Sequence, residues 1–376
     1  MRIRVVGTAA VHPQHLQSTK RLTGDFDFMA SHHQVLALAA ALAVAIPAQS
    51  QPDQPRQSAL APASLAQKID QLGAGFAGRV GISVQSVEGG WRTGWKDGEL
   101  YPQQSVSKFI VALTAMDGID KGRLRLEEPV SLTRSDLTLF NQPIAQRVLG
   151  GGTYTTTVLE LLTDALTKSD NTANDKLMRV AGGPDTVRAM IVAKRLGAIR
   201  FYDGERALQS RIAGLTWSQN FSIGDAFYKA RNALPMSIRR SLFNRYIEDP
   251  YDGASPAALV ETLTRLKRGE LLSPSSTARL LTIMSNTRTG KNRLRGGLKP
   301  GWSLNHKTGT GQVLDGVQAG YNDIGIITAP DGRSYAVAVM IKKTSTPLIV
   351  RMNLMNEVVR SVIESHETSA GARLSF

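Results

Sequence analysis

The chain has 376 residues, 42% of them hydrophobic and none of them cysteine, so it can bury a core but cannot form disulfides, thiolate metal sites or a lipoprotein anchor. Its formal charge of +14 suits an anionic substrate, an anionic envelope surface or nucleic acid. Nucleic acid is disfavoured, because the sequence contains no basic run with interleaved aromatic residues and no nucleic-acid-binding module. The length favours two domains or one two-lobed unit.

Residues 35–46 form an apolar run of 12 residues, which is followed by Pro-Ala-Gln-Ser. The run is too short to span a bilayer, and the whole pattern is typical of a secretory signal. We expect residues 1–48 to be a signal peptide cleaved near Ala48, with Met29 as an alternative start. Residues 49–62 are rich in Gln, Pro, Ser and Ala, which predicts a linker. The expected destination is the periplasm or the medium, with no stable membrane anchor after cleavage.

The hydrophobic periodicity after the linker predicts helices and strands in a mixed order. Strands are expected at 79–87, 91–95, 305–310, 323–328 and 335–342. Helices are expected at 65–76, from near Ser105, at 157–168, 174–180, 184–196, 223–234, 236–248, 256–266, 277–284 and 349–365.

The stretch Ser105-Val106-Ser107-Lys108 opens the apolar helix that follows Tyr101-Pro102. Residues three apart share one helix face, so the Ser105 hydroxyl and the Lys108 amine can meet. A serine hydroxyl becomes a nucleophile when a base takes its proton, and a lysine in apolar or cationic surroundings can be that base. This motif alone is expected about once by chance in a chain of this size.

Two further motifs follow it. Ser169-Asp170-Asn171 begins 64 residues after Ser105, and Lys307-Thr308-Gly309 begins 138 residues after Ser169. Each tripeptide is expected by chance in roughly one chain in ten or fewer. In this order the three motifs resemble those of the class A β-lactamases and, more broadly, the penicillin-recognising serine hydrolases.

The resemblance implies an α/β (α+β) fold in which an antiparallel sheet is flanked by helices and joined to an all-helical lobe. We expect one β-lactamase-like domain at 63–376, with its sheet lobe at 63–100 and 289–376 and its helical lobe at 101–288. The site would lie between the lobes.

The resemblance also implies a mechanism. Ser105 would attack the lactam carbonyl, with Lys108, or Glu205 acting through a water, as the base. Ser169 would pass a proton to the leaving nitrogen, and the backbone N–H groups of Ser105 and Thr310 would form an oxyanion hole. The residues expected to bind the substrate are Phe140, Asn171, Gln209, Lys307, Thr308, Gly309 and Thr310.

The segment Glu205-Arg206-Ala207-Leu208-Gln209 resembles the family's loop that carries the deacylating carboxylate, with Gln209 in place of an asparagine. The family's loop is commonly pinned by an arginine paired with an aspartate. Here Asp203 and Asp252 occupy these positions, and two carboxylates would repel each other. An insert at about 210–251 lies between them.

We expect the insert to fix the loop by packing, with Arg211, Arg239 or Arg245 neutralising the two carboxylates. A separate departure concerns the arginine that often assists binding of the substrate carboxylate. The family's strand position holds Asn322, which leaves Arg351 as a weak candidate.

Other chemistries are disfavoured by counting. Only His306 and His366 remain after residue 48, and the alternation of a strand turns His306 away from the side that Lys307 faces. Two distant histidines without cysteine do not make a catalytic zinc site, so no metal or cofactor is expected. The alternatives left open are a penicillin-binding DD-peptidase, a related serine esterase and a non-catalytic envelope binding protein. A monomer is expected, with a small-molecule β-lactam as its partner.

Overall fold

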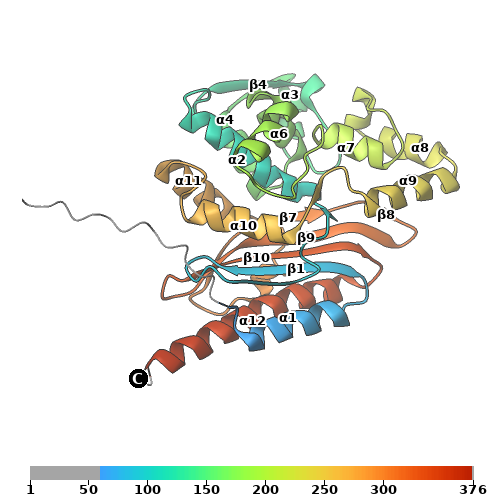
Figure 1. Cartoon of the computed structure of the whole chain (residues 1–376). Coiled ribbons are helices and arrows are strands. Elements are labelled where there is room, and N and C mark those ends of the chain that lie inside the picture. Colours follow the sequence, from blue (N-terminus) through green and yellow to red (C-terminus); the bar gives the residue numbers. More distant parts are fainter. Residues whose placement is uncertain (1–59, 375–376) are drawn as a thin grey trace, which may run out of the picture. The chain divides into compact units, whose positions relative to one another are not determined.

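A computed structural model describes residues 60–374, which form a sheet lobe and a helical lobe (Figure 1). The predicted signal peptide and nearly all of the predicted linker lie outside the described residues. The main sheet has six strands in the order β2-β1-β10-β9-β7, with β8 paired to β9, and all its pairs are antiparallel. The predicted mixed fold with an antiparallel sheet is confirmed. The strands are β1 (Arg79–Ser86), β2 (Arg92–Trp95), β7 (Ser303–Thr310), β8 (Val313–Leu314), β9 (Val317–Thr328) and β10 (Ser334–Thr344).

Both faces of this sheet are buried. On β10, Val337 and Val339 face the helices α1 (Ala63–Gly75) and α12 (Leu348–Leu374), whereas Ala338 faces the helical lobe. Figure 1 shows α1 and α12 together on one side of the sheet and the remaining helices on the other. Because alternate side chains enter two different cores, the central strands read as nearly continuous apolar runs.

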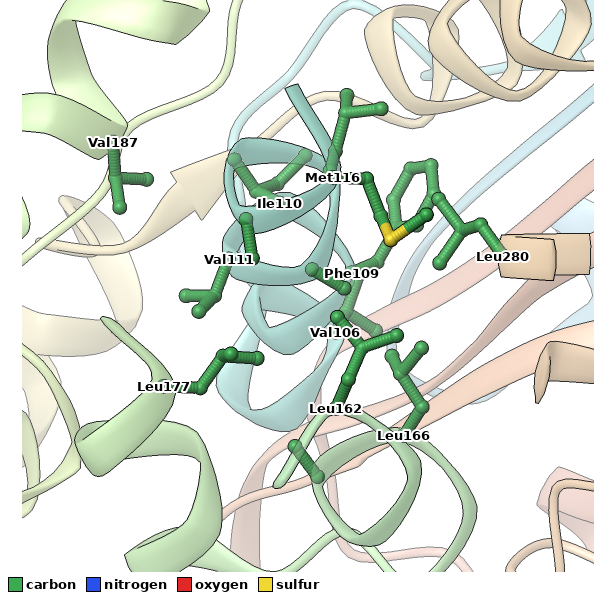
Figure 2. Packing of buried hydrophobic residues seen from close by; sticks show 14 of the residues in the cluster. Val106, Phe109, Ile110, Val111, Met116, Leu162, Leu166, Leu177, Val187 and Leu280 are labelled. Atoms are coloured by element: carbon green, nitrogen blue, oxygen red, sulfur yellow. The ribbon is translucent and has the colours of Figure 1, made fainter. Parts of the chain in front are cut away.

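The helical lobe is built around α2 (Ser107–Asp120), whose residues are buried from Ser107 to Gly118. Figure 2 shows its apolar side chains surrounded by residues of other helices, including Leu162, Leu177 and Leu280. A helix that is buried on all sides needs no amphipathic stripe. The other helices are α3 (Ala145–Gly151), α4 (Val158–Thr167), α5 (Asn171–Val180), α6 (Gly183–Ala193), α7 (Glu205–Ile212), α8 (Ala226–Ala233), α9 (Met236–Glu248), α10 (Pro256–Lys267) and α11 (Pro274–Ser285).

Shorter elements connect these helices. Two small antiparallel pairs, β3 with β6 and β4 with β5, are absent from the expectations above. Their bounds are β3 (Tyr101–Pro102), β6 (Gly253–Ala254), β4 (Pro129–Thr133) and β5 (Thr153–Thr157), and the 3₁₀ turns are η1 (Gln104–Val106), η2 (Arg134–Asp136), η3 (Gln219–Ser222) and η4 (Leu294–Gly297).

Several helix bounds differ from prediction because side-chain caps set them. Helix α5 begins at Asn171, three residues earlier than expected, since the Asp170 carboxylate accepts a hydrogen bond of 2.9 Å from Ala173 N. Helix α11 begins at Pro274 because Ser273 caps it. None of the helices in the described part of the chain combines the length and apolarity that a membrane crossing requires.

Candidate active site

A cleft of about 760 Å³ brings the three sequence motifs together. It is open to solvent and is walled by the turn at η1, the strand β7, the helix α7 and the inserted helix α8. The predicted site residues that line the cleft are Ser105, Phe140, Ser169, Asn171, Glu205, Gln209, Thr308 and Thr310. The predicted residues Lys108, Lys307 and Gly309 lie directly behind this lining, in the contacts given below.

Ser105 lies in η1, immediately before α2, and Lys108 is the second residue of that helix. Lys108 Nζ donates a hydrogen bond of 2.9 Å to Ser105 Oγ. The same amine forms an ion pair with Glu205 Oε1, and the side chains of Lys108 and Glu205 are 0% and 4% exposed. A hydroxyl, an amine and a carboxylate therefore form one chain of proton-transfer groups, of which the amine and the carboxylate are buried.

The residue before Ser105 holds a strained backbone. Gln104 has φ of 53°, a left-handed conformation that costs about 1–2 kcal/mol in a residue with a Cβ. Its N–H donates a 2.7 Å hydrogen bond to Asp252 Oδ2, and its side-chain amide donates a 2.5 Å hydrogen bond to Tyr246 Oη. These buried contacts hold the turn that aims Ser105 at the cleft.

Glu205 is the first residue of α7, a short helix within the segment that resembles the family's loop. Gly204 has φ of 90°, and a Cβ there would lie 2.9 Å from Asp175 Oδ1, so glycine is required. Asp175 in turn accepts a 2.9 Å hydrogen bond from Glu205 N. Burial, and then the nearby Glu205 carboxylate, raise the pKa of Asp175. The start of α7 is thus fixed from the α5 side.

The Glu205 carboxylate is also held from its own helix. Gln209 Nε2 donates to Glu205 Oε2 at 3.2 Å and to Gln104 Oε1 at 2.9 Å. Gln312 Nε2 donates to Gln209 Oε1 at 3.0 Å. Gln209 therefore links the carboxylate to the turn before Ser105 and to the segment after β7.

The expected repulsion between Asp203 and Asp252 is wrong, because each carboxylate has its own partner. Asp203 forms an exposed ion pair of 2.9 Å with Arg188. Asp252 is buried and accepts a 2.9 Å hydrogen bond from Tyr246 Oη.

The three arginines that were expected to neutralise Asp203 and Asp252 do not form ion pairs with either carboxylate. Arg211 stacks on the ring of Tyr251, with its Cζ 4.4 Å from the centroid. Arg239 and Arg245 form no ion pair within residues 60–374. Sequence reasoning missed Arg188 and Tyr246, since neither belongs to a recognisable motif.

The second and third motifs meet at Ser169 and Lys307. Lys307 Nζ, fully buried on β7, donates a 2.9 Å hydrogen bond to Ser169 Oγ. Burial, and then the neighbouring charge of Lys108, lower the pKa of Lys307 well below its usual range. Ser169 has φ of 57°, and its carbonyl accepts a 2.9 Å hydrogen bond from Asn141 Nδ2. A hydroxyl bonded to a lysine that releases its proton readily can act in proton transfer.

Gly309 allows β7 to approach the nucleophile turn. A Cβ at this position would lie 2.3 Å from the carbonyl oxygen of Gln103, which no side chain can occupy. The side chain of Asn322, opposite Gly309 on β9, donates to the carbonyl oxygens of Pro102 and Gln103 at 2.7 and 3.1 Å. The glycine of the third motif therefore has a packing role.

The remaining predicted residues border the cleft. Asn171 Nδ2 donates a 2.9 Å hydrogen bond to the carbonyl of Leu139, which fixes its amide at the start of α5. Phe140 is 39% exposed at the cleft and packs edge-on against Phe227 of α8, with centroids 5.1 Å apart. Thr308 Oγ1 lies 2.7 Å from Thr289 Oγ1.

Arg293 lines the cleft and was missed by the sequence analysis. Its guanidinium donates hydrogen bonds of 2.6 Å to Thr310 Oγ1 and 3.0 Å to the carbonyl of Gly309, and it lies 3.8 Å from the centroid of the Tyr321 ring. The weak candidate Arg351 is wrong: it is absent from the cleft lining and bonds Gln318 Oε1 and the carbonyl of Thr346. Arg293 is in a loop 14 residues before Lys307, where no short motif marks it.

His306 points away from the cleft into the sheet lobe. Its Nδ1 lies 2.9 Å from Asp323 Oδ1, and both side chains are fully buried. Within residues 60–374, no three His, Cys, Asp or Glu side chains form a group that could hold a metal ion. The chemistry available in this cleft is that of serine, lysine and glutamate.

Comparison with known proteins agrees with this geometry. The profile of the β-lactamase enzyme family matches residues 64–365. Beta-lactamase VEB-1 of Pseudomonas aeruginosa is 27% identical over 69% of this chain and 76% of its own length, and extended-spectrum β-lactamase PER-1 of the same organism is 28% identical over 66% and 69%.

Solved structures give the same result. A β-lactamase from Chitinophaga pinensis superposes with a TM-score of 0.66 at 27% identity and covers 80% of this chain and 99% of its own. The TLA-1 extended-spectrum β-lactamase superposes with a TM-score of 0.66 at 26% identity and covers 80% and 98%. With its motifs assembled in one cleft and its sequence matched over 64–365, the chain belongs to the class A β-lactamase family.

Proposed function

We propose that this protein is a serine β-lactamase that hydrolyses the lactam amide of penicillins and cephalosporins through an acyl-enzyme on Ser105. The observation that carries the proposal is the position of Lys108 Nζ, which is 2.9 Å from Ser105 Oγ and in an ion pair with Glu205. A DD-peptidase needs the contact between Lys108 and Ser105 but not the contact between Lys108 and Glu205, because it does not use a carboxylate to hydrolyse the acyl-enzyme.

Acylation requires removal of the Ser105 proton. Lys108 is in direct contact with the hydroxyl, and Glu205 is one residue further along the same chain of contacts. Either Lys108 directly, or Glu205 through a water, acts as the base. The oxyanion formed on the lactam carbonyl is stabilised by the backbone N–H groups of Ser105 and Thr310, and each such donor typically contributes about a hundredfold to a thousandfold in rate.

Opening of the lactam ring requires a proton on the leaving nitrogen. Ser169 supplies it and is recharged through Lys307, whose Nζ is 2.9 Å from Ser169 Oγ. The substrate carboxylate binds at the Arg293 end of the cleft, where Thr308 and Thr310 offer hydroxyl groups. A guanidinium is suited to a carboxylate because it offers two parallel donors.

Deacylation requires an activated water. Glu205 takes the proton of this water, and Gln209, which donates to Glu205 Oε2 at 3.2 Å, holds the carboxylate in place. Asn171 binds the acyl amide of the substrate. No cofactor is needed for either step.

The place of action follows from the same proposal. We infer export to the periplasm or the medium by a Sec-type signal, no stable membrane anchor, and function as a monomer with a β-lactam as its partner. Hydrolysis there protects the cell wall machinery and gives antibiotic resistance.

The direct test labels the nucleophile. The purified protein is incubated with a chromogenic cephalosporin to measure turnover, and with a fluorescent penicillin that is quenched in acid during turnover to trap the acyl-enzyme, followed by digestion and mapping. We expect turnover of the first, and the label on Ser105. The Ser105→Ala variant should lose both, whereas the matched Ser107→Ala variant, whose hydroxyl bonds the carbonyl of Gln104 and not Lys108, should keep labelling. Label on another residue contradicts the proposal.

A further inference from the structure

The inserted helix α8 brings a second arginine to the cleft. Arg231 lines the cleft together with Tyr228, Gln312 and Val313. It also lines a separate small pocket together with Arg239 and the end of α7. Figure 1 shows α7, α8 and α9 together beside β8, and residues of all four elements line this pocket.

The two arginines lack a compensating carboxylate. Within residues 60–374, neither the Arg231 nor the Arg239 side chain forms an ion pair or a hydrogen bond, and the Nε atoms of both are buried without a partner. Burial, and then the charge of Arg239, lower the pKa of Arg231. The one carboxylate that lines the cleft, Glu205, is already paired with Lys108. A partly buried cation without a partner favours an anionic ligand.

Aromatic residues beside Arg231 indicate a second chemical group in the ligand. The Arg231 Cζ is 5.2 Å from the centroid of the Tyr228 ring, and the rings of Tyr228 and Phe140 are in contact, with their centroids 6.0 Å apart. An aromatic wall thus stands beside the cation.

Arg293, which the proposed function assigns to the carboxylate of the lactam core, contacts Gly309 and Thr310 of β7, whereas Arg231 lies on α8. Gln209 lines the cleft with Asn171 and accepts a hydrogen bond from Gln312, which lines both pockets together with Arg231. An acylamino side chain that extends from Asn171 past Gln209 and Gln312 would reach Arg231.

We propose that Arg231 is a specificity-determining residue that selects β-lactams whose acylamino side chain carries a second carboxylate beside an aromatic ring. This inference deepens the proposed function and rests on it, because it concerns the substrate class of the same cleft. The carboxylate lies against the Arg231 guanidinium, and the ring packs on Tyr228 and Phe140.

The test uses a matched pair of substrates. Carbenicillin is benzylpenicillin with one additional carboxylate on the α carbon of its phenylacetyl side chain. The constant kcat/KM for hydrolysis of each is measured, because kcat/KM covers only the steps up to and including acylation and does not depend on deacylation. The quantity of interest is the ratio of the two constants, compared between the parent protein and Arg231→Gln.

Losing one charge-assisted contact should lower the ratio about tenfold, with benzylpenicillin unchanged. The matched control is Lys229→Gln, which also removes one positive charge from α8. The Lys229 side chain is paired with Asp225 and is 76% exposed. Its ratio should equal that of the parent. Arg231→Lys, which keeps the charge without the planar fork, should give an intermediate ratio.

Equal ratios in Arg231→Gln and the parent overturn the inference, as does an equal loss for both penicillins, which indicates a structural role. The proposed function fails separately, through absence of benzylpenicillin hydrolysis in the parent.

Discussion

Tyr246 Oη donates a 2.9 Å hydrogen bond to Asp252 Oδ1, while Asp252 Oδ2 accepts a 2.7 Å hydrogen bond from Gln104 N. Through this relationship a residue of the insert supports the strained turn that carries Ser105. Tyr246 also accepts a hydrogen bond from the Gln104 amide, whose oxygen bonds Gln209. The insert therefore connects to both ends of the proposed catalytic chain.

Tyr246→Phe removes the hydroxyl and keeps the ring. The buried Asp252 and Gln104 groups each lose a partner, and a single unsatisfied buried group costs about 1–3 kcal/mol. We expect the free energy of unfolding to fall by about this amount in a urea titration, and deacylation to slow more than acylation. Tyr202→Phe, which removes a hydroxyl that bonds the exposed Arg211, is the control and should change neither. If the free energy of unfolding of Tyr246→Phe equals that of the parent, the Tyr246 hydroxyl does not stabilise the fold.

The Asp252 carboxylate makes stability depend on pH. Burial raises its pKa from 3.8 to about 6, so the native state keeps a proton that the unfolded state releases between these values. This group therefore stabilises the fold below about pH 4, and its contribution is lost as the pH rises to about 6.

Asp252→Asn cannot lose that proton. Relative to the parent, its free energy of unfolding should rise between pH 4 and pH 6 by up to about 3 kcal/mol, the equivalent of roughly two pKa units. Urea titrations across this range measure the difference. Asp203→Asn, which breaks an exposed ion pair with Arg188, should shift stability by less than about 1 kcal/mol at every pH. A difference for Asp252→Asn that is flat with pH would show that the carboxylate is ionised throughout.

Phe243 tests the packing of the insert against α7. It is 5% exposed and belongs to a cluster with Leu208, Ile212 and Ile247 that joins α9 to α7. Phe243→Ala should destabilise the protein by about 3–5 kcal/mol and slow deacylation, because the helix that carries Glu205 loses its support. Acylation of Ser105 should be largely retained.

The matched control on the same helix is Ile238→Ala, at a side chain that is 46% exposed. It should have little effect on stability or rate. If Phe243→Ala leaves the acylation and deacylation rates unchanged, packing of the insert against α7 does not contribute to deacylation.

Arg293 and Arg351 give opposite expectations for substrate binding. Arg293→Gln should lower kcat/KM about tenfold to a hundredfold, mainly through KM, because the substrate carboxylate loses a charge-assisted partner. Arg351→Gln should leave kcat/KM unchanged, since its guanidinium does not line the cleft. Steady-state kinetics with one cephalosporin measure both. The reverse result would restore Arg351 as the carboxylate residue.

The sequence predicted the elements whose signal is local. The strand β10 reads as an apolar run and the helix α9 as an amphipathic one, and α9 has the predicted bounds. Asp170 shows the limit of this reasoning: its side chain starts α5 three residues early, a capping choice that periodicity does not express. In β4, Val130 and Leu132 alternate with exposed residues and enter the core of the helical lobe, a short strand pattern that the sequence analysis missed. Its partner β5 is mostly threonine and carries little hydrophobic signal.

The sequence predicted those site residues that belong to recognisable motifs and missed those that do not. Ser105, Ser169 and Lys307 come together because each lies in a recognisable triplet. Arg293 and Tyr246 act through contacts that span 17 residues and 142 residues of sequence, to Thr310 and Gln104. Such contacts depend on the tertiary fold, and neither residue type is unusual where it stands.

The measurement that tests the account most directly is an intact-mass time course of the parent and Glu205→Gln with a penicillin. Removing a positioned base typically costs about a hundredfold to ten-thousandfold in rate. We predict that Glu205→Gln accumulates a stable adduct of one penicillin on Ser105, while the parent turns the drug over and returns to its free mass. A parent that stays acylated for hours, with Glu205→Gln no different from it, would contradict the account and favour a penicillin-binding DD-peptidase.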